Sequence, residues 1–212
     1  MKEIKLEEKY ILEYIKYMIS SFKMKPIEVN NAKYHHNTSY SNVPLVLKHG
    51  ILSVSEQNRL GIKKYSPEIL NLWSDIESHI NGIDSISLSV VGLTDLYANE
   101  FEYDPFSPID VDFNISNDIR AGRSSIHYGN EFLCYESIGV DKIKSIDIRL
   151  LQLIEKEKNF TIKYIISRYN FLRDIALTLK QNNLDIPFRE MSNDTSSLDI
   201  TKVSEMPKLI LK

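Results

Sequence analysis

Apolar residues between positions 6 and 22 recur every three or four residues, which is the spacing of one face of an α-helix. They are Leu6, Tyr10, Ile11, Tyr14, Ile15, Met18, Ile19 and Phe22. Pro26 cannot continue a helix, so we expect this helix to end before it. Charged residues interrupt the segment throughout, and we therefore expect neither a signal peptide nor a membrane span here.

Three further helices are predicted from their start and stop signals. Ser41 is a suitable N-cap for a short helix, in which Pro44 fits the first turn and Gly50 is the stop. A second helix is expected to open at Ser66. A longer apolar stripe predicts a helix from about residue 161 to residue 180.

The middle of the chain alternates between apolar and polar positions, which is typical of half-buried β-strands. We expect strands at residues 85–91, 110–116, 131–138 and 142–151, after a short strand that ends in the pair His35 and His36. A polar loop that contains glycine is expected at residues 117–130. Few apolar residues follow Glu190 until the last positions, so the tail should be weakly ordered.

This order of elements, with helices first, strands in the middle and helices last, predicts an α+β fold. The length of 212 residues suits a single domain. We divide it into an N-terminal helix at residues 1–26, a core at residues 27–150, and a C-terminal helix and tail at residues 151–212.

The net charge of −3 gives no overall attraction to nucleic acid or to an anionic membrane, although a local basic groove is compatible with it. Cys134 is the single cysteine, so no internal disulfide can form. That composition fits a reducing compartment, and we expect a cytoplasmic protein without membrane association. Cys134 lies among apolar neighbours and is expected to be buried and inert.

Adjacent residues of a strand point to opposite faces, so His35 and His36 are poorly placed to hold one metal ion together. The other histidines, His49, His79 and His127, are scattered and have no ligand spacing. No metal site is therefore predicted. The sequence also contains no glycine-rich phosphate loop and no nucleophile elbow of the form GxSxG.

The stretch YHHNTS at residues 34–39 precedes a predicted short helix that ends in HGIL at residues 49–52. This arrangement resembles the first motif of the ADP-ribosyltransferase fold, in which Tyr-His-Gly-Thr-Ser is followed by such a helix. The spacing His-x-Thr favours His36 as the histidine of that motif, and His35 is the alternative.

Two later segments resemble the same family in the same order. A central strand carries small hydroxyl residues, here Ser87 and Ser89. A glutamate then opens a late strand, here Glu131, and a strand of the form Ile-x-x-Ile follows. The resemblance spans about residues 33–148 and leaves the flanking helices uncovered.

The resemblance implies two small antiparallel sheets that form a cleft for NAD, with helices on either side. It also implies an enzyme that uses NAD as a substrate and transfers ADP-ribose to a macromolecular acceptor, either protein or nucleic acid. Breakage of the nicotinamide–ribose bond gives the ribose an oxocarbenium character, as in glycoside hydrolysis. A nearby carboxylate stabilises the positive charge that develops there.

Within that resemblance, Glu131 is the catalytic carboxylate and His36 binds the ribose on the adenosine side. The segment around Asn37 and Thr38 would hold the nicotinamide amide, and the two serines would shape the floor of the pocket. The cofactor-binding residues implied are therefore His36, Asn37, Thr38, Ser87 and Ser89.

The loop before Glu131 is the expected place for contact with the acceptor, through Arg120, Arg123, His127 and Tyr128. Arginine can pair with phosphate, and tyrosine can stack on a base. Members that modify arginine carry Gln or Glu two residues before the catalytic glutamate, where this chain has glycine, so arginine is disfavoured as the acceptor.

The setting that we expect is a toxin or a phage or host-conflict effector, with an antitoxin or inhibitor as a possible partner. One alternative is a non-catalytic module on the same fold that binds a nucleotide or a protein partner. Another is an RNA 2′-phosphotransferase, which also consumes NAD. The weakly acidic charge balance makes that last alternative less favourable, because such an enzyme must grip phosphate.

Overall fold

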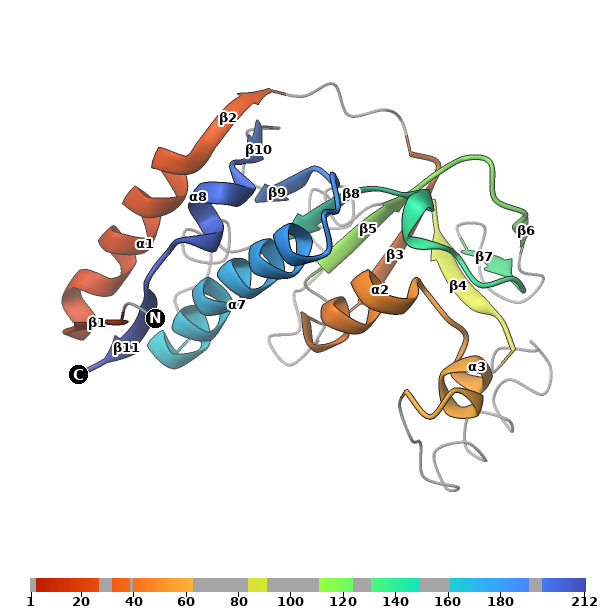
Figure 1. Ribbon diagram of the computed structural model, residues 1–212, viewed down its shortest axis with the longest axis horizontal. Coiled ribbons are helices and arrows are strands. Elements are labelled where there is room, and N and C mark those ends of the chain that lie inside the picture. The colour runs from red at the N-terminus through yellow and green to blue at the C-terminus, as the bar shows by residue number, and fades with distance from the viewer. Residues whose placement is uncertain are drawn as a thin grey trace.

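The computed structural model describes residues 3–26, 32–38, 40–62, 84–90, 111–123, 131–148, 161–190 and 196–212. Within these residues, five helices accompany a mixed, mostly antiparallel nine-stranded sheet and a small two-stranded sheet (Figure 1). The predicted α+β class is therefore confirmed.

The helices are α1 (Glu8–Phe22), α2 (Val43–His49), α3 (Val54–Arg59), α7 (Ile162–Gln181) and α8 (Ile200–Ser204). The strands of the first half are β1 (Glu3–Leu6), β2 (Lys23–Pro26), β3 (Tyr34–Thr38), β4 (Ile86–Ser89), β5 (Val111–Ile115) and β6 (Gly122–Arg123). Those of the second half are β7 (Glu131–Cys134), β8 (Ile143–Ile148), β9 (Phe188–Glu190), β10 (Ser196–Leu198) and β11 (Lys208–Leu211).

The large sheet has the order β2-β10-β9-β8-β5-β3-β4-β7-β6. It differs from the two small antiparallel sheets that were expected, because the described strands join in one series and β8 pairs with β9 in parallel. The pairing of His35 in β3 with Ser89 in β4 joins the strands into one sheet. The C-terminal segment enlarges that sheet. Its strands β9 and β10 extend the sheet beyond β8, and Phe188 of β9 is completely buried.

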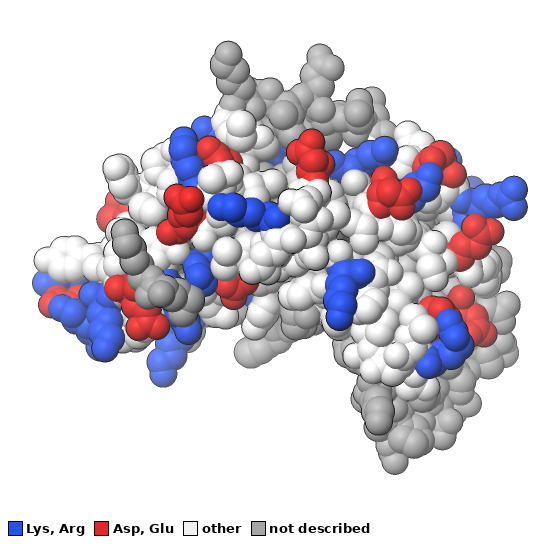
Figure 2. Space-filling model, viewed as in Figure 1, with Lys and Arg blue, Asp and Glu red and all other residues white. Residues whose placement is uncertain are grey.

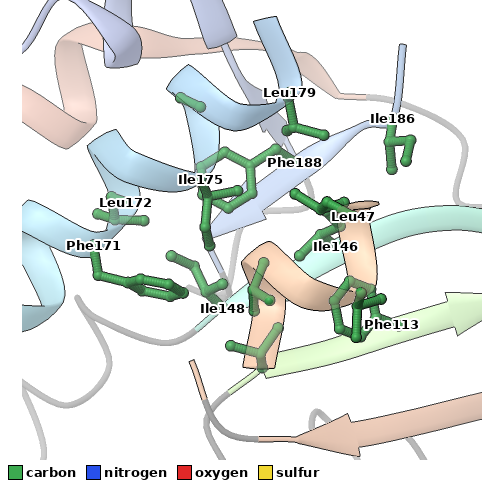
Figure 3. Close-up of a cluster of buried hydrophobic side chains, with 14 of the residues drawn as sticks. Leu47, Phe113, Ile146, Ile148, Phe171, Leu172, Ile175, Leu179, Ile186 and Phe188 are labelled. Carbon is green, nitrogen blue, oxygen red and sulfur yellow. The ribbon is translucent and has the colours of Figure 1, made fainter. Parts of the chain in front are cut away.

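The core lies between this sheet and the helices α2 and α7, which cover the same face of β5 and β8 (Figure 1). Phe113, Ile146 and Phe188 stand beside one another in register on neighbouring strands and are fully buried. Figure 3 shows them near Leu47 of α2 and Ile175 of α7. Burial of such side chains contributes roughly 1.5–3 kcal/mol each.

The start of α2 is fixed to α7 by aromatic contacts. The Arg168 guanidinium lies 4.0 Å from the centre of the Tyr40 ring and 4.4 Å from that of Tyr164. The Tyr40 ring also meets Phe171 edge-on, with 5.0 Å between centroids. These contacts set where the chain turns from β3 into α2.

Most predicted elements of the described residues are confirmed: α1 ends before Pro26, α2 ends at Gly50, and α7 spans the expected range. The N-cap of α2 is Asn42 and not Ser41, because a 3₁₀ turn at Tyr40–Asn42 comes first. The helix expected to open at Ser66 lies outside the described residues. The short strands β1, β2 and β6 and the helix α3 were not predicted.

The prediction of a weakly ordered tail is wrong for residues 196–212, which form β10, α8 and β11. Asp199 caps α8 by accepting from the N–H groups of Thr201 and Lys202. The side chain of Asn170 in α7 accepts from the N–H of Leu209 and donates to its carbonyl, at 2.8 and 3.0 Å. Strand β11 also pairs in parallel with β1.

In the part of the chain that the structure describes, no helix is both long enough and apolar enough to span a membrane.

Gly50 has a backbone conformation that other residues rarely adopt, with φ of +79° and ψ of −176°. Its neighbour Ile51 exchanges two backbone hydrogen bonds with Ile138, both of 2.9 Å. A Cβ atom on Gly50 would stand 2.4 Å from the carbonyl oxygen of Ile138. Glycine is therefore required where the chain leaves α2.

We predict that Gly50→Ala lowers the free energy of unfolding by at least about 2 kcal/mol, because the strain of φ adds to a backbone clash. The matched control is Gly61→Ala. Gly61 also has a positive φ, of +64°, but a Cβ atom added there would meet nothing within 4 Å, so its cost should stay near ~1 kcal/mol. Urea unfolding measures both, and equal losses would contradict the close-approach argument.

Candidate functional site

The nine-stranded sheet has few paired residues between β3 and β4. In the described residues, β3 pairs with β4 at one position, His35 opposite Ser89. By contrast, β3 pairs with β5 over five positions, and β4 pairs with β7 over four. After His35 the strands β3 and β4 therefore part, and each keeps its partner on the other side.

The imidazole of His36 stands in this gap. Its Nδ1 lies 3.0 Å from the backbone carbonyl oxygen of Ser87 on β4. A carbonyl oxygen can only accept, so Nδ1 must carry the proton. Burial lowers the pKa of His36, against the raising effects of that hydrogen bond and of Asp112. The ring is therefore neutral near pH 7 and its Nε2 is an acceptor.

Glu131 lies on the other side of the same serine. The Ser87 hydroxyl donates a hydrogen bond of 2.5 Å to Glu131 Oε1. One residue of β4 thus holds His36 through its carbonyl and Glu131 through its side chain. The two members of the predicted pair are thus linked through one serine, and no hydrogen bond joins them directly in the part of the chain that the structure describes.

A pocket of about 380 Å³, including its opening to solvent, lies beside the gap. His36 and Thr38 line it from β3, and the rest of its wall comes from α2, α3 and their connection. The lining residues are His36, Thr38, Asn42, Leu45, Val46, His49, Gly50, Ile51, Leu52, Gln57 and Ile62. Glu131 is not among them, so the pocket contains one member of the predicted pair.

Two side-chain hydrogen bonds shape the wall of this pocket. Asn42 donates to the Thr38 hydroxyl at 2.9 Å, and Gln57 donates to the Leu52 carbonyl at 2.9 Å. His49 lines the pocket from the end of α2, although sequence reasoning assigned it no role in a site. The one sequence signal for this position of His49 is that it directly precedes Gly50, the residue at which α2 ends.

Strand alternation separates the two adjacent histidines, as predicted. His35 is in register with Ser89, which is in register with Glu131, so these three side chains share one face of the sheet. His36 is in register with Phe113 and belongs to the face that α2 and α7 cover. His36 and Glu131 therefore leave the sheet from different faces, and Ser87 is the residue that both contact.

His35 has its own buried partner. Its Nδ1 lies 2.9 Å from Asp112 Oδ2, and the two side chains are 14% and 1% exposed. Asp147 stands beside Asp112 in register, and Arg189 binds it with two nitrogens. Sequence reasoning missed this group, although the alternating polar residues of the strand Val-Asp-Phe-Asn-Ile carry a signal for a second polar face.

The residues predicted to contact the acceptor are only partly described. Arg120 and Arg123 are exposed. Arg123 lies on β6, in register with Phe132 of β7, one position from Glu131. His127 and Tyr128 lie outside the described residues. On the face drawn in Figure 2, basic and acidic side chains are interspersed over the described elements.

Among the residues that the structure describes, no three histidine, cysteine or acidic side chains gather as a metal ion would require. Cys134 is buried, as predicted, and burial raises the pKa of its thiol. Neither observation adds a metal or a thiol nucleophile to the site.

Comparisons with protein families, with curated protein sequences and with solved structures find no match to this chain.

The lowered pKa of His36 predicts a pH dependence of stability. The unfolded chain binds a proton at this position near pH 6.5, whereas the folded chain does so only at lower pH. The free energy of unfolding should therefore fall as the pH drops below 6.5. Urea unfolding at about pH 7.5 and about pH 5.5 tests this, with His36→Gln as comparison, since Gln can still donate to Ser87. An equal pH dependence in both proteins would contradict it.

Proposed function

We propose that this protein breaks the bond between nicotinamide and ribose in NAD and transfers ADP-ribose to a macromolecular acceptor. The observation that carries the proposal is the connection from His36 through Ser87 to Glu131 across the gap between β3 and β4. Three motifs that are far apart in the sequence supply it, and the resemblance to ADP-ribosyltransferases assigned a role to each.

Glu131 is the group that would stabilise the ribose as the bond breaks. The ribose then carries oxocarbenium character, and a carboxylate beside it lowers the barrier. Glu131 is half-buried at the start of β7, and Ser87 holds one of its oxygens in place. A held carboxylate does not have to reorganise during the reaction, which favours catalysis.

His36 would bind a ribose hydroxyl of NAD. With its proton fixed on Nδ1 by Ser87, the neutral ring presents Nε2 as an acceptor. A hydroxyl is a matching donor. The pocket beside His36 offers both apolar walls and polar side chains, such as Thr38 and Asn42.

Asn37 supports placing the nicotinamide at the gap. Its side-chain Oδ1 is buried and has no hydrogen-bond partner among the described residues. A buried acceptor without a partner is costly, so a ligand that donates to it is favoured. The carboxamide of nicotinamide has two N–H donors. Asn37 follows His36 on β3, where that strand has already left β4.

In this proposal NAD binds in the pocket beside His36 within one sheet, in place of a cleft between two separate sheets. The dinucleotide would extend from the pocket at His36 to Glu131 on the other face. Ser87 and Ser89 would form the floor below the reacting ribose. The exposed Arg120 and Arg123 would meet an acceptor that carries phosphate or carboxylate groups.

We predict that Glu131→Gln lowers the rate of nicotinamide release from NAD by at least about 100-fold, because the amide cannot stabilise the oxocarbenium charge. Binding of NAD should change little. The control is Glu136→Gln, which alters an exposed glutamate just after β7 and should leave the rate unchanged. Chromatography of nicotinamide and calorimetric titration with NAD provide the two measurements.

The result separates the alternatives. If the wild-type protein binds NAD but releases no nicotinamide, a non-catalytic binding module is supported in place of an enzyme. If Glu131→Gln retains the full rate, the assignment of the carboxylate is wrong. Incubation with labelled NAD and with protein, DNA or RNA in separate reactions then shows which class of acceptor gains label.

His36→Ala should raise the dissociation constant of NAD by about tenfold, which corresponds to one lost hydrogen bond of about 1.4 kcal/mol. The catalytic rate constant at saturating NAD should fall much less than in Glu131→Gln. Steady-state kinetics separates the two effects. A loss confined to the rate constant, with unchanged affinity, would remove His36 from the binding site.

A further inference from the structure

Arg168 of α7 is a buried cation that the proposed function does not use. It is 6% exposed, and its guanidinium carbon lies 4.0 Å from the centre of the Tyr40 ring and 4.4 Å from that of Tyr164. Its Nη2 also donates to the Tyr164 hydroxyl at 2.9 Å. The face of a tyrosine ring attracts a guanidinium, and the attraction is stronger when both groups are removed from water. Arg168 therefore attaches Tyr40 to α7.

Tyr40 belongs to the segment that leads into the pocket. It begins the 3₁₀ turn at Tyr40–Asn42, which directly precedes α2. In the sequence it lies between Thr38 and Asn42, which both line the pocket, although Tyr40 is not itself a lining residue. Its ring lies against α7 instead, where Phe171 meets it edge-on with 5.0 Å between centroids. The turn that carries pocket residues is thus held by α7 through Tyr40.

The orientation of this turn decides what the pocket wall offers to a ligand. The Asn42 side chain donates to the Thr38 hydroxyl at 2.9 Å, and this bond connects the end of β3 with the start of α2. Because the Thr38 oxygen accepts from Asn42, the hydrogen of that hydroxyl is available to an acceptor on a ligand. Both side chains would move if the turn at residues 40–42 moved.

We infer that Arg168 is a positioning residue for NAD in this pocket and that it acts through Tyr40; this rests on the proposed function. Neither residue lines the pocket, so neither contacts the ligand there. Their contact keeps the turn in the orientation that presents Thr38 and Asn42 to NAD. The pocket wall is then formed before the ligand arrives, and such preorganisation raises affinity because the ligand does not have to order its own site.

The groups assigned to the reaction are held by other elements. Ser87 on β4 donates to Glu131 on β7, and its backbone carbonyl accepts from His36 on β3. None of these contacts includes α2 or α7. Loss of the contact between Arg168 and Tyr40 should therefore weaken NAD binding, while the rate constant at saturating NAD stays nearly unchanged.

The helix α2 has its own attachment to the core, which separates a role in binding from a role in folding. Val43 and Leu47 of α2 are buried, and Leu47 lies among the apolar side chains of the central strands (Figure 3). Tyr40 is only half-buried. A substitution of Tyr40 should therefore leave α2 in place and release the turn that precedes it.

The test compares two tyrosines that contact the same guanidinium. Tyr40→Leu removes the ring next to the pocket wall, and the matched control Tyr164→Leu removes the ring on α7 itself. Calorimetric titration should show that Tyr40→Leu raises the dissociation constant of NAD about tenfold, as expected if the turn keeps its binding orientation for about a tenth of the time. Tyr164→Leu should bind NAD as wild type does, and so should Tyr40→Phe, which keeps the ring.

A double variant tests whether Arg168 acts through Tyr40. Arg168→Leu should weaken NAD binding as much as Tyr40→Leu does, and the double variant should bind no more weakly than either, because both changes remove one contact. Urea unfolding records the stability of each variant separately. Nicotinamide release at saturating NAD should stay close to the wild-type rate in all of them.

The outcomes are distinguishable. If wild type does not bind NAD, the proposed function and this inference both fall. If it binds NAD but releases no nicotinamide, the proposed reaction falls, and the binding data still decide the role of Arg168. That role is overturned if Tyr40→Leu and Tyr164→Leu weaken binding equally, or if the effects of Tyr40→Leu and Arg168→Leu add.

Folding of the variants is checked by circular dichroism. If Arg168→Leu does not fold, the comparison of Tyr40→Leu with Tyr164→Leu decides. If Tyr40→Leu does not fold, Tyr40 is required for the fold itself, and the inference is overturned.

Discussion

The candidate site depends on one hydrogen bond, in which the side chain of His36 takes the place of a backbone contact between β3 and β4. Where β3 leaves β4, the carbonyl oxygen of Ser87 is met by the imidazole of His36. This contact allows the sheet to open without an unpaired backbone acceptor at that position, which would be costly. It also fixes the tautomer of His36 and leaves the Ser87 hydroxyl for Glu131. The opening between the strands and the arrangement of His36, Ser87 and Glu131 therefore have the same cause.

The alternation of strand residues separates the molecule into two environments. On one face, apolar side chains such as Phe113 and Ile146 pack against α2 and α7 (Figure 3). On the other, Asp112, Asn114 and Asp147 form a buried polar group. Such a group is stable only when its members are paired. Alternation along β3, β5 and β8 thus produces an apolar core and a buried polar group on opposite faces of the same strands.

Sequence patterns predicted the elements that bury one continuous stripe, such as α1 and α7, and the strand around Leu88. They could not give the register, which decides that His35 faces Glu131 and His36 faces the pocket. Residues 196–198, Ser-Ser-Leu, have no strand pattern of their own. They are ordered because β9 and β2 supply backbone partners on both sides. Local motifs singled out His36 and Glu131 as candidates, whereas the contact of Asp112 with His35 depends on the register of β3 and β5.

The pairing of β1 with β11, and of β2 with β10, gives the order of synthesis a consequence. Residues 3–6 and 23–26 leave the ribosome early, yet their backbone partners are residues 208–211 and 196–198. The strands β1 and β2 therefore cannot form these pairs until the C-terminal residues have been synthesised. A growing chain would therefore expose the unpaired backbone edges of residues 3–6 and 23–26 until these partners have been made.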